Sequence, residues 1–253
     1  LVSGPVGCGK TFLINCFAGE IGIPMVKLKN FRSQWQGVTE GNLEKILNLL
    51  EAMTPVAVMI DEADAALGDR DAQGDSGVSQ RVFSQIVSFM SDPAHRGRVI
   101  FFLVTARPDL MPVDLKRQGR AEEHLSLFYP HTRADREELL RVMMRRTGVD
   151  LPIEAVPPEL LEGERTYSGA DMEAVLTRAA FRAAGSNDGT VTPALLQETV
   201  NDFIPPTYPT EVELQQLAAV LECTSRDLLP ERFRSMKREE VVERLEQLKR
   251  MVD

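Results

Sequence analysis

The feature that most constrains this chain is a short stretch near its start, GPVGCGKT at residues 4 to 11, which fits G-x-x-x-x-G-K-[ST]. The apolar residues before it read as the end of a strand, and a helical pattern follows. In that context the glycines let backbone N–H groups turn inward around an anion, at the N-terminus of the helix. The sequence therefore predicts a phosphate-binding loop between a strand and a helix, and we expect further chain upstream of residue 1.

A second strand supplies carboxylates. The stretch VAVMIDEAD is an apolar run that ends in adjacent acidic residues. Asp61 and Thr11 offer the oxygen ligands that Mg²⁺ prefers, and Lys10 would reach the β- and γ-phosphates of a nucleotide. Glu62 is directed differently and would orient or deprotonate an attacking water. We expect Asp64 to be a solvated neighbour of this pair.

Strand-like and helical patterns alternate in the first half of the chain. Apolar, β-branched runs at residues 55 to 60 and 98 to 104 predict buried strands, and residues 79 to 90 have helical spacing between them. Such alternation predicts an α/β fold, a parallel sheet sandwiched by helices. We expect this large nucleotide-binding domain to cover residues 1 to 130.

Helical patterns alone follow Pro130. Three of them predict a small all-helical lid domain at residues 131 to 204. Three prolines at residues 205 to 210 interrupt the pattern, and two amphipathic stretches then predict a helical C-terminal extension over residues 205 to 253.

Composition limits the kinds of partner. The net charge of -9 argues against a surface that binds nucleic acid through phosphate contacts. No apolar run reaches the roughly 18 residues of a membrane-spanning helix, so we expect no membrane insertion. Three scattered cysteines indicate a reducing, cytoplasmic compartment. The three histidines lack metal-ligand spacing and predict surface or capping roles.

With both nucleotide motifs in place, residues 1 to about 204 resemble the AAA branch of the AAA+ ATPases, P-loop NTPases such as N-ethylmaleimide-sensitive fusion protein, valosin-containing protein, katanin and spastin. Residues 74 to 90 are similar to the second region of homology and its approach, and TARPDLMPVDLKRQGR is similar to the family's NRPD…LxRxGR segment. SGAD at residues 168 to 171 matches the lid signature. These relatives work as hexameric rings that pull apart or unfold proteins.

The resemblance implies roles for individual residues. ATP and Mg²⁺ would be the cofactors, with Arg117 and Arg120 reaching the γ-phosphate of a neighbouring subunit as arginine fingers. Residues that would contact the nucleotide are Gly4, Pro5, Val6, Gly7, Cys8, Gly9, Lys10, Thr11, Phe12 and Asp61, with Leu139, Gly169 and Ala170 near the adenine.

The single tryptophan, Trp35, lies in a polar setting and is followed by Gln36 and Gly37. This matches the position of the family's aromatic-hydrophobic-glycine loop, which projects into the central pore. An exposed indole would grip successive side chains of a protein substrate through area and stacking. The alternative is a tryptophan packed under its own domain.

One departure concerns the hydrolytic site. Most relatives carry asparagine just before RPD, where its amide contacts the γ-phosphate and the attacking water, and this chain has Ala106. Thr105 is polar and adjacent, but neighbouring strand residues point to opposite faces. Thr105 would replace the amide only if the strand end is slipped or bulged, so we expect slow or conditional hydrolysis.

Several functions stay open. The first is a ring motor that remodels or unfolds protein substrates with ATP, and a specialised activase for one enzyme partner is a close variant. A nucleotide-gated assembly module with vestigial hydrolysis is the alternative that Ala106 favours. The acidic charge opposes a nucleic-acid motor, and no HExxH motif follows the lid to indicate a zinc protease.

Overall fold

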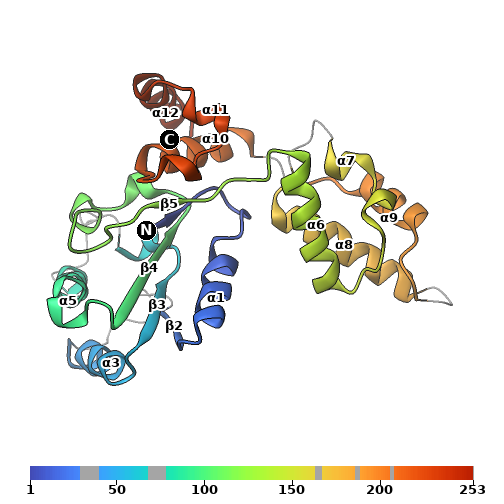
Figure 1. Ribbon diagram of the computed structural model, residues 1–253. Coiled ribbons are helices and arrows are strands. Elements are labelled where there is room, and N and C mark those ends of the chain that lie inside the picture. Colours follow the sequence, from blue (N-terminus) through green and yellow to red (C-terminus); the bar gives the residue numbers. More distant parts are fainter. Residues whose placement is uncertain (29–39, 68–77, 163–166, 186–188, 206–207, 253) are drawn as a thin grey trace. The chain divides into compact units, whose positions relative to one another are not determined.

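The computed structural model describes residues 1–28, 40–67, 78–162, 167–185, 189–205 and 208–252 (Figure 1). The chain divides into two compact units. The first comprises Leu1–Gly4, Lys10–Leu127 and Glu213–Asp253, and the second comprises Pro5–Gly9 and Phe128–Val212. The domain boundaries near residues 130 and 204 stay a proposal.

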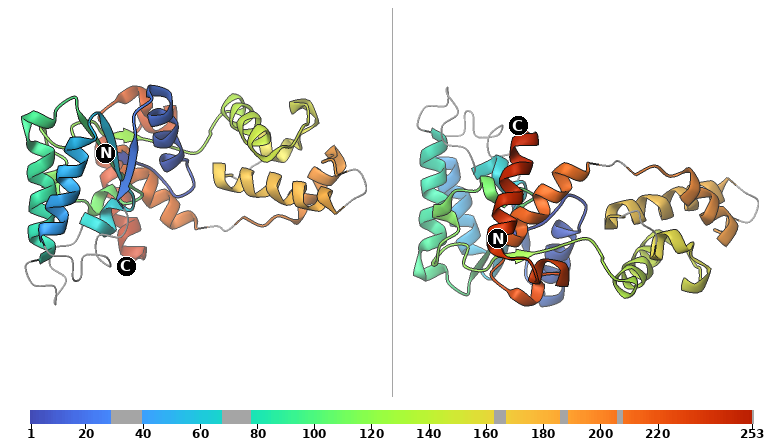
Figure 2. Two further views of the ribbon diagram at one scale, coloured as in Figure 1. Left: turned by 90° about the horizontal axis from the view of Figure 1, so that it is seen from below. Right: turned by 90° about the horizontal axis from the view of Figure 1, so that it is seen from above.

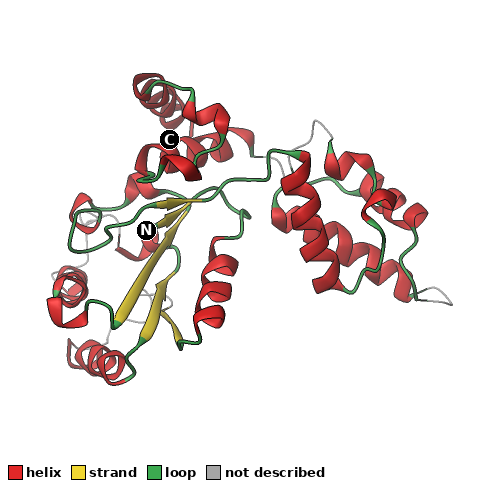
Figure 3. Ribbon diagram, viewed as in Figure 1, coloured by secondary structure: helices red, strands yellow, loops and turns green. Residues whose placement is uncertain are grey.

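A parallel sheet forms the centre of the first unit (Figure 3). Its strands are β1 (Val2–Ser3), β2 (Met25–Leu28), β3 (Val56–Ile60), β4 (Val99–Thr105) and β5 (Leu125–Ser126). They lie in the order β2-β3-β4-β1-β5, and every pair is parallel. The predicted α/β class and both strands are confirmed; β3 is buried throughout, whereas β4 is buried only over its last three residues.

Helices cover both faces of this sheet. Figures 1 and 2 show α1 on one side and α3 and α5 on the other. The alternation along β4 matches this arrangement, since Phe102 and Val104 pack with Ile14 of α1, whereas Phe101 packs with Phe89 of α5. The helices of this part are α1 (Lys10–Ile21), α3 (Glu40–Ala52), α4 (Ala63–Leu67) and α5 (Val78–Ser91), with 3-10 turns η1 (Pro93–His95), η2 (Pro108–Leu110) and η3 (Val113–Leu115).

The strand order brings the two nucleotide motifs to one edge of the sheet. β4 lies between β3 and β1, with Ile60 opposite Leu103 and Ser3 opposite Thr105. The carboxyl ends of these three parallel strands are therefore neighbours, and ligands of open α/β sheets bind at that edge.

The C-terminal extension is helical, as predicted, and from Glu213 onward it belongs to the first unit. It contains α10 (Pro209–Glu222), η5 (Arg226–Leu228), α11 (Glu231–Arg234) and α12 (Arg238–Val252). Helix α10 ends at Glu222, and the backbone N–H of Thr224 donates instead to the carbonyl oxygen of His124 at 3.0 Å.

Two of the three histidines have the predicted capping role, although both are buried, and the third lies at the surface. The Nδ1 atom of His95 lies 2.9 Å from the carbonyl oxygen of Phe89, in the last turn of α5. The Nδ1 atom of His124 lies 3.0 Å from the carbonyl oxygen of Glu222, at the end of α10. His131 is exposed.

The second unit is a group of helices around one apolar core. They are α6 (Arg133–Thr147), α7 (Pro158–Leu161), α8 (Gly169–Ala184) and α9 (Pro193–Asp202), with the 3-10 turn η4 (Ile153–Ala155). Thr132 and Ser168 begin α6 and α8 with capping boxes, and Gly148 ends α6 in the left-handed conformation.

Among the described residues, every helix is too short or too polar to span a bilayer.

Candidate functional site

The glycines of the predicted phosphate loop adopt backbone conformations that other residues rarely take. The φ angles are 145° at Gly4, 76° at Gly7 and 93° at Gly9. Helix α1 begins at Lys10, directly after the loop, and the Nζ atom of Lys10 donates to the carbonyl oxygen of Gly4 at 2.8 Å. A tightly turned glycine loop that runs into a helix N-terminus is the arrangement that binds phosphate.

The carboxylate of Asp61 meets two side chains from other elements. Its Oδ2 atom accepts a hydrogen bond from the Thr11 hydroxyl at 3.2 Å and another from the Lys27 ammonium at 2.6 Å. Burial raises the pKa of Asp61, but the hydrogen bonds and charge of Lys27, with the Thr11 and Glu62 donors, outweigh it and lower the pKa. Asp61 is therefore an anion beside a hydroxyl.

This pair fits a magnesium ion bound with a nucleotide. Mg²⁺ is usually held by one or two protein oxygens together with phosphate and water oxygens, rather than by a cage of side chains. Asp61 and Thr11 supply two such oxygens, and the described residues contain no group of three acidic, histidine or cysteine side chains that would form a closed metal cage.

Glu62 follows directly and has an unusual backbone. It is the one non-glycine residue with a positive φ, 51°, in the part of the chain that the structure describes. A non-glycine residue in this region costs of order 1–3 kcal/mol and points to a functional constraint. The turn exposes Glu62, while its neighbour Asp61 is directed to Thr11.

Thr105 is held at the end of β4. It is 1% exposed, its hydroxyl donates to Oδ1 of Asp64 at 2.6 Å, and its own Oγ1 atom accepts from the backbone N–H of Arg107 at 2.8 Å. Asp64 is thus not the merely solvated neighbour that we expected, because it anchors the end of β4. The hydroxyl of Thr105 already has a donor and an acceptor, while Ala106 offers no polar group.

The two candidate arginine fingers have different surroundings. Arg120 donates to the Ser91 hydroxyl at 3.0 Å and to the carbonyl oxygen of Asp114 at 2.6 Å, so its guanidinium is bound within its own unit. Arg117 is exposed, and among the described residues its guanidinium has no hydrogen bond or ion pair. Arg117 is therefore the arginine available to another molecule.

In the second unit, the phosphate loop packs against the start of α8. A Cβ atom on Gly7 would lie 2.9 Å from Oγ of Ser168, so no larger residue fits there. A Cβ atom on Gly169 would lie 3.5 Å from the carbonyl oxygen of Gly7 and 3.6 Å from a methyl of Leu139. The structure thus brings the predicted lid residues Leu139 and Gly169, with Ala170 beside Gly7, to the loop.

Two contacts of the nucleotide motifs were not predicted from the sequence. Lys27 lies on β2, a strand that we did not predict, and Tyr129 donates its hydroxyl to the carbonyl oxygen of Val6 at 2.6 Å. Burial, with smaller effects of Cys8 and Asp171, raises the pKa of Tyr129 to about 12, so the phenol stays a donor. Tyr129 follows β5 by three residues, and its local sequence gave no signal of this contact.

The pore-loop residues Trp35, Gln36 and Gly37 lie outside the described residues, as does the first part of the second region of homology. Phe12 is exposed on α1 by 43% of its surface.

Comparison with known proteins agrees with these motifs. The family model for the ATPase family associated with various cellular activities (AAA) matches residues 1–129. A cell division cycle protein 48 homolog from Archaeoglobus fulgidus is 32% identical over 185 residues, which cover 72% of this chain and 25% of the relative. An ATP-dependent zinc metalloprotease FtsH from Haemophilus influenzae is 31% identical over 196 residues, covering 76% and 30%.

A third relative, an ATPase family protein 2 homolog from Caenorhabditis elegans, is 29% identical over 76% of this chain and 26% of its own length. The chain therefore spans about a quarter of the length of these relatives. With the family model over half of the sequence and the glycine loop and carboxylates in place, this chain belongs to the AAA family of ATPases.

Proposed function

We propose that this chain is the ATP-hydrolysing subunit of a ring that remodels or unfolds protein substrates. The observation that supports it most directly is the contact between Thr11 and Asp61 at 3.2 Å, with Lys10 and the exposed Glu62 each one residue away. These four side chains provide the groups that phosphoryl transfer to water requires.

Each residue then has a distinct task. Lys10 would bind the β- and γ-phosphates, and Thr11 and Asp61 would hold Mg²⁺, which would neutralise charge on the phosphates. Glu62 accepts a hydrogen bond from the attacking water and takes its proton. The loop backbone from Gly4 to Phe12 binds phosphate, and Leu139, Gly169 and Ala170 pack against the adenine.

The second part of the proposal is assembly as a homo-oligomer, with a hexameric ring as the form. Arg117 is exposed and makes no hydrogen bond or ion pair with another described residue, which supports this part of the proposal, since such a guanidinium can act on a neighbour's γ-phosphate. Arg120, bound to Ser91 and Asp114, would fix the loop that presents Arg117. Trp35, Gln36 and Gly37 would grip a protein substrate in the central pore.

A cytoplasmic location is part of the same proposal. All three cysteines, Cys8, Cys16 and Cys223, are free thiols. Free cysteines are usual in a reducing compartment.

A nucleotide-gated assembly module is the second candidate. The observation that favours it is Thr105, whose hydroxyl is already bonded to Asp64 while Ala106 carries no polar group. In that case ATP would build the ring and hydrolysis would be vestigial.

Steady-state turnover against protein concentration, with and without an unstructured protein substrate, separates the two. The motor predicts that turnover per subunit rises as rings assemble and rises again with substrate. An assembly module predicts that rings form with ATP while turnover stays near the background rate. Turnover well above the background rate that is independent of dilution would contradict both forms of the proposal.

A further inference from the structure

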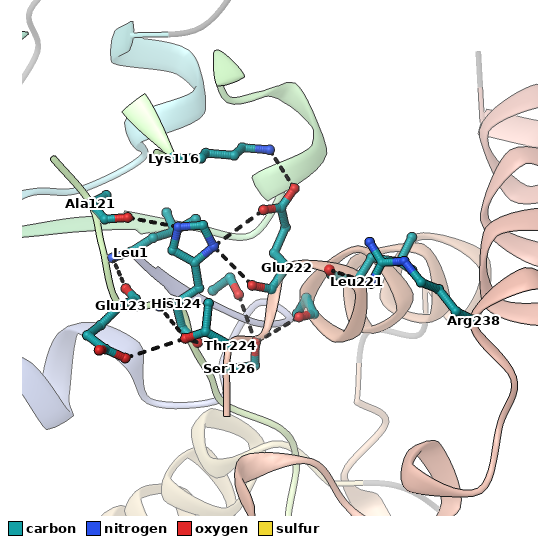
Figure 4. Close-up of polar contacts among 12 residues, drawn as sticks. Leu1, Lys116, Ala121, Glu123, His124, Ser126, Leu221, Glu222, Thr224 and Arg238 are labelled. Carbon is teal, nitrogen blue, oxygen red and sulfur yellow. Dashed lines mark hydrogen bonds and ion pairs between the residues drawn. The ribbon is translucent and has the colours of Figure 1, made fainter. Parts of the chain in front are cut away.

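The segment that contains Arg117 and Arg120 is held at both ends by one residue of the C-terminal extension (Figure 4). The Nζ atom of Lys116 lies 2.6 Å from Oε1 of Glu222. At the other end, Nδ1 of His124 lies 3.5 Å from Oε2 of Glu222 and 3.0 Å from its backbone carbonyl oxygen. Glu222 therefore bridges the two ends of residues 116 to 124.

These contacts are shielded from water. The side chains of Lys116, His124 and Glu222 are 12%, 7% and 23% exposed. Burial raises the pKa of Glu222, but the hydrogen bonds of His124 and Lys116 outweigh it and lower the pKa, so Glu222 is held as the anion. A largely buried carboxylate that is bonded to two side chains restrains their positions more than an exposed ion pair does.

Further hydrogen bonds join the C-terminal extension to the edge of the sheet. The N–H of His124 donates to Oγ1 of Thr224, and the N–H of Thr224 donates to the carbonyl oxygen of His124, both at 3.0 Å. The Ser126 hydroxyl of β5 donates to the carbonyl oxygen of Ala219 at 2.8 Å. Since β5 is the edge strand, the extension covers that edge and sets the position of the chain that leads into it.

The C-terminal extension also contacts the turn that precedes residues 116 to 124. Asp109 accepts two hydrogen bonds from Arg107, both at 3.0 Å, and its Oδ2 atom lies 3.5 Å from Nζ of Lys249 on α12. The Asp109 side chain is 8% exposed. Both α10 and α12 thus contact the stretch from residue 107 to 124, on either side of Arg117.

We propose that Glu222 is a positioning residue for the trans-acting arginine, and that the C-terminal extension serves to hold residues 116 to 124 in the shape that presents Arg117 to the neighbouring subunit. This inference rests on the proposed role of Arg117 in the ring. It assigns a task to the extension: Glu222 acts on the hydrolysis carried out by the neighbour, and not on the nucleotide bound by its own subunit.

Mixed assemblies test this distinction. A donor subunit carries Glu62→Gln, which removes its own turnover but leaves Arg117 intact, and an acceptor subunit carries Arg117→Ala. Mixing the two should restore turnover in acceptor sites that lie next to a donor. Glu222→Gln is then added to the donor alone or to the acceptor alone, and Glu213→Gln in the donor is the matched control, because Glu213 on α10 pairs with Arg244 of α12 away from the segment.

The inference predicts that Glu222→Gln in the donor lowers the restored turnover about 10- to 100-fold, the loss expected when a reacting group is displaced by about an ångström. The same change in the acceptor should leave turnover near the parental mixture, which also demonstrates that the variant folds and assembles. Lys116→Met in the donor should reproduce the loss, and Glu213→Gln should not.

Equal losses in donor and acceptor would mean a general structural role and would overturn the inference, as would no loss in the donor. If the parental mixture itself restores no turnover, the trans-acting role of Arg117 fails, and the inference fails with it. The two failures are therefore distinct readouts of one experiment.

Discussion

The Lys27 ammonium lies 2.6 Å from Oδ2 of Asp61, the same oxygen that accepts the Thr11 hydrogen bond. Lys27 and Thr11 thus bond to the same oxygen atom of the Asp61 carboxylate. Both side chains are partly exposed, at 32% and 27%, so the ion pair is worth about 0.2–1 kcal/mol. Lys27 and Mg²⁺ would therefore compete for this oxygen.

We accordingly expect Lys27→Met to bind Mg–nucleotide at a lower Mg²⁺ concentration, with the half-saturating concentration reduced by up to about fivefold. Titration of a fluorescent nucleotide at a series of Mg²⁺ concentrations measures this. Lys27→Arg keeps the charge and serves as the control. A higher Mg²⁺ requirement in Lys27→Met would mean that Lys27 assists the metal site.

Gly7 should be indispensable for nucleotide binding. A Cβ atom there meets Ser168 at 2.9 Å and forces a φ of 76° on a larger residue, whereas Gly22 has a similar φ of 69° and open space around it. Both Gly7→Ala and Gly22→Ala should lose about 1–2 kcal/mol of unfolding free energy through the backbone alone. Only Gly7→Ala should also lose nucleotide affinity, as measured by titration, and equal affinities in the two variants would contradict the steric argument.

Much of this site follows from local sequence, because its parts are contiguous. The glycine loop, Asp61 and Glu62 stand next to strands whose apolar runs are unmistakable, so their position could be predicted. Lys27 and Tyr129 could not, since each contacts a residue that is remote in sequence or lies on a strand too short to stand out.

The expectations that failed also concern contacts between residues that are remote in sequence. We expected Asp64 to be solvated because its partner, Thr105, is separated from it by 41 positions. The anchoring of residues 116 to 124 depends on contacts across about 100 positions, which no periodicity reveals. Most helix and strand types were thus predictable, whereas the short strand β2 and the contacts that join distant segments were not.

Thr105 should be structural rather than catalytic. Thr105→Val keeps the shape but removes the hydrogen bonds that Thr105 makes to Asp64 and accepts from the N–H of Arg107, which should cost about 1–3 kcal/mol of unfolding free energy. Denaturant unfolding measures that loss. An unchanged stability together with a large loss of turnover would instead make Thr105 the sensor of the γ-phosphate.

Ala106→Asn should speed hydrolysis. An added amide would supply a hydrogen bond to charge that develops in the transition state, a class of contact worth roughly 2.7–4 kcal/mol in other enzymes. We expect a clear increase in the single-turnover rate with little change in nucleotide affinity. An unchanged rate in Ala106→Asn would show that this position does not face the reacting phosphate.

Trp35 should be separable from ATP chemistry. Trp35→Ala should retain assembly and basal turnover and lose the unfolding of a protein substrate, while Trp35→Tyr should keep most of it, because an aromatic surface remains. Truncation of a buried aromatic typically costs about 3–5 kcal/mol, so a large drop in melting temperature would make Trp35 a core residue.

The central claim is that Glu62 activates water beside a nucleotide held by Lys10, Thr11 and Asp61. The most direct measurement compares nucleotide affinity and single-turnover hydrolysis in the same samples of the wild type, Glu62→Gln and Lys10→Ala. Glu62→Gln should bind ATP as the wild type does and fail to hydrolyse it, while Lys10→Ala should lose the binding itself. Hydrolysis by Glu62→Gln at the wild-type rate would contradict the account.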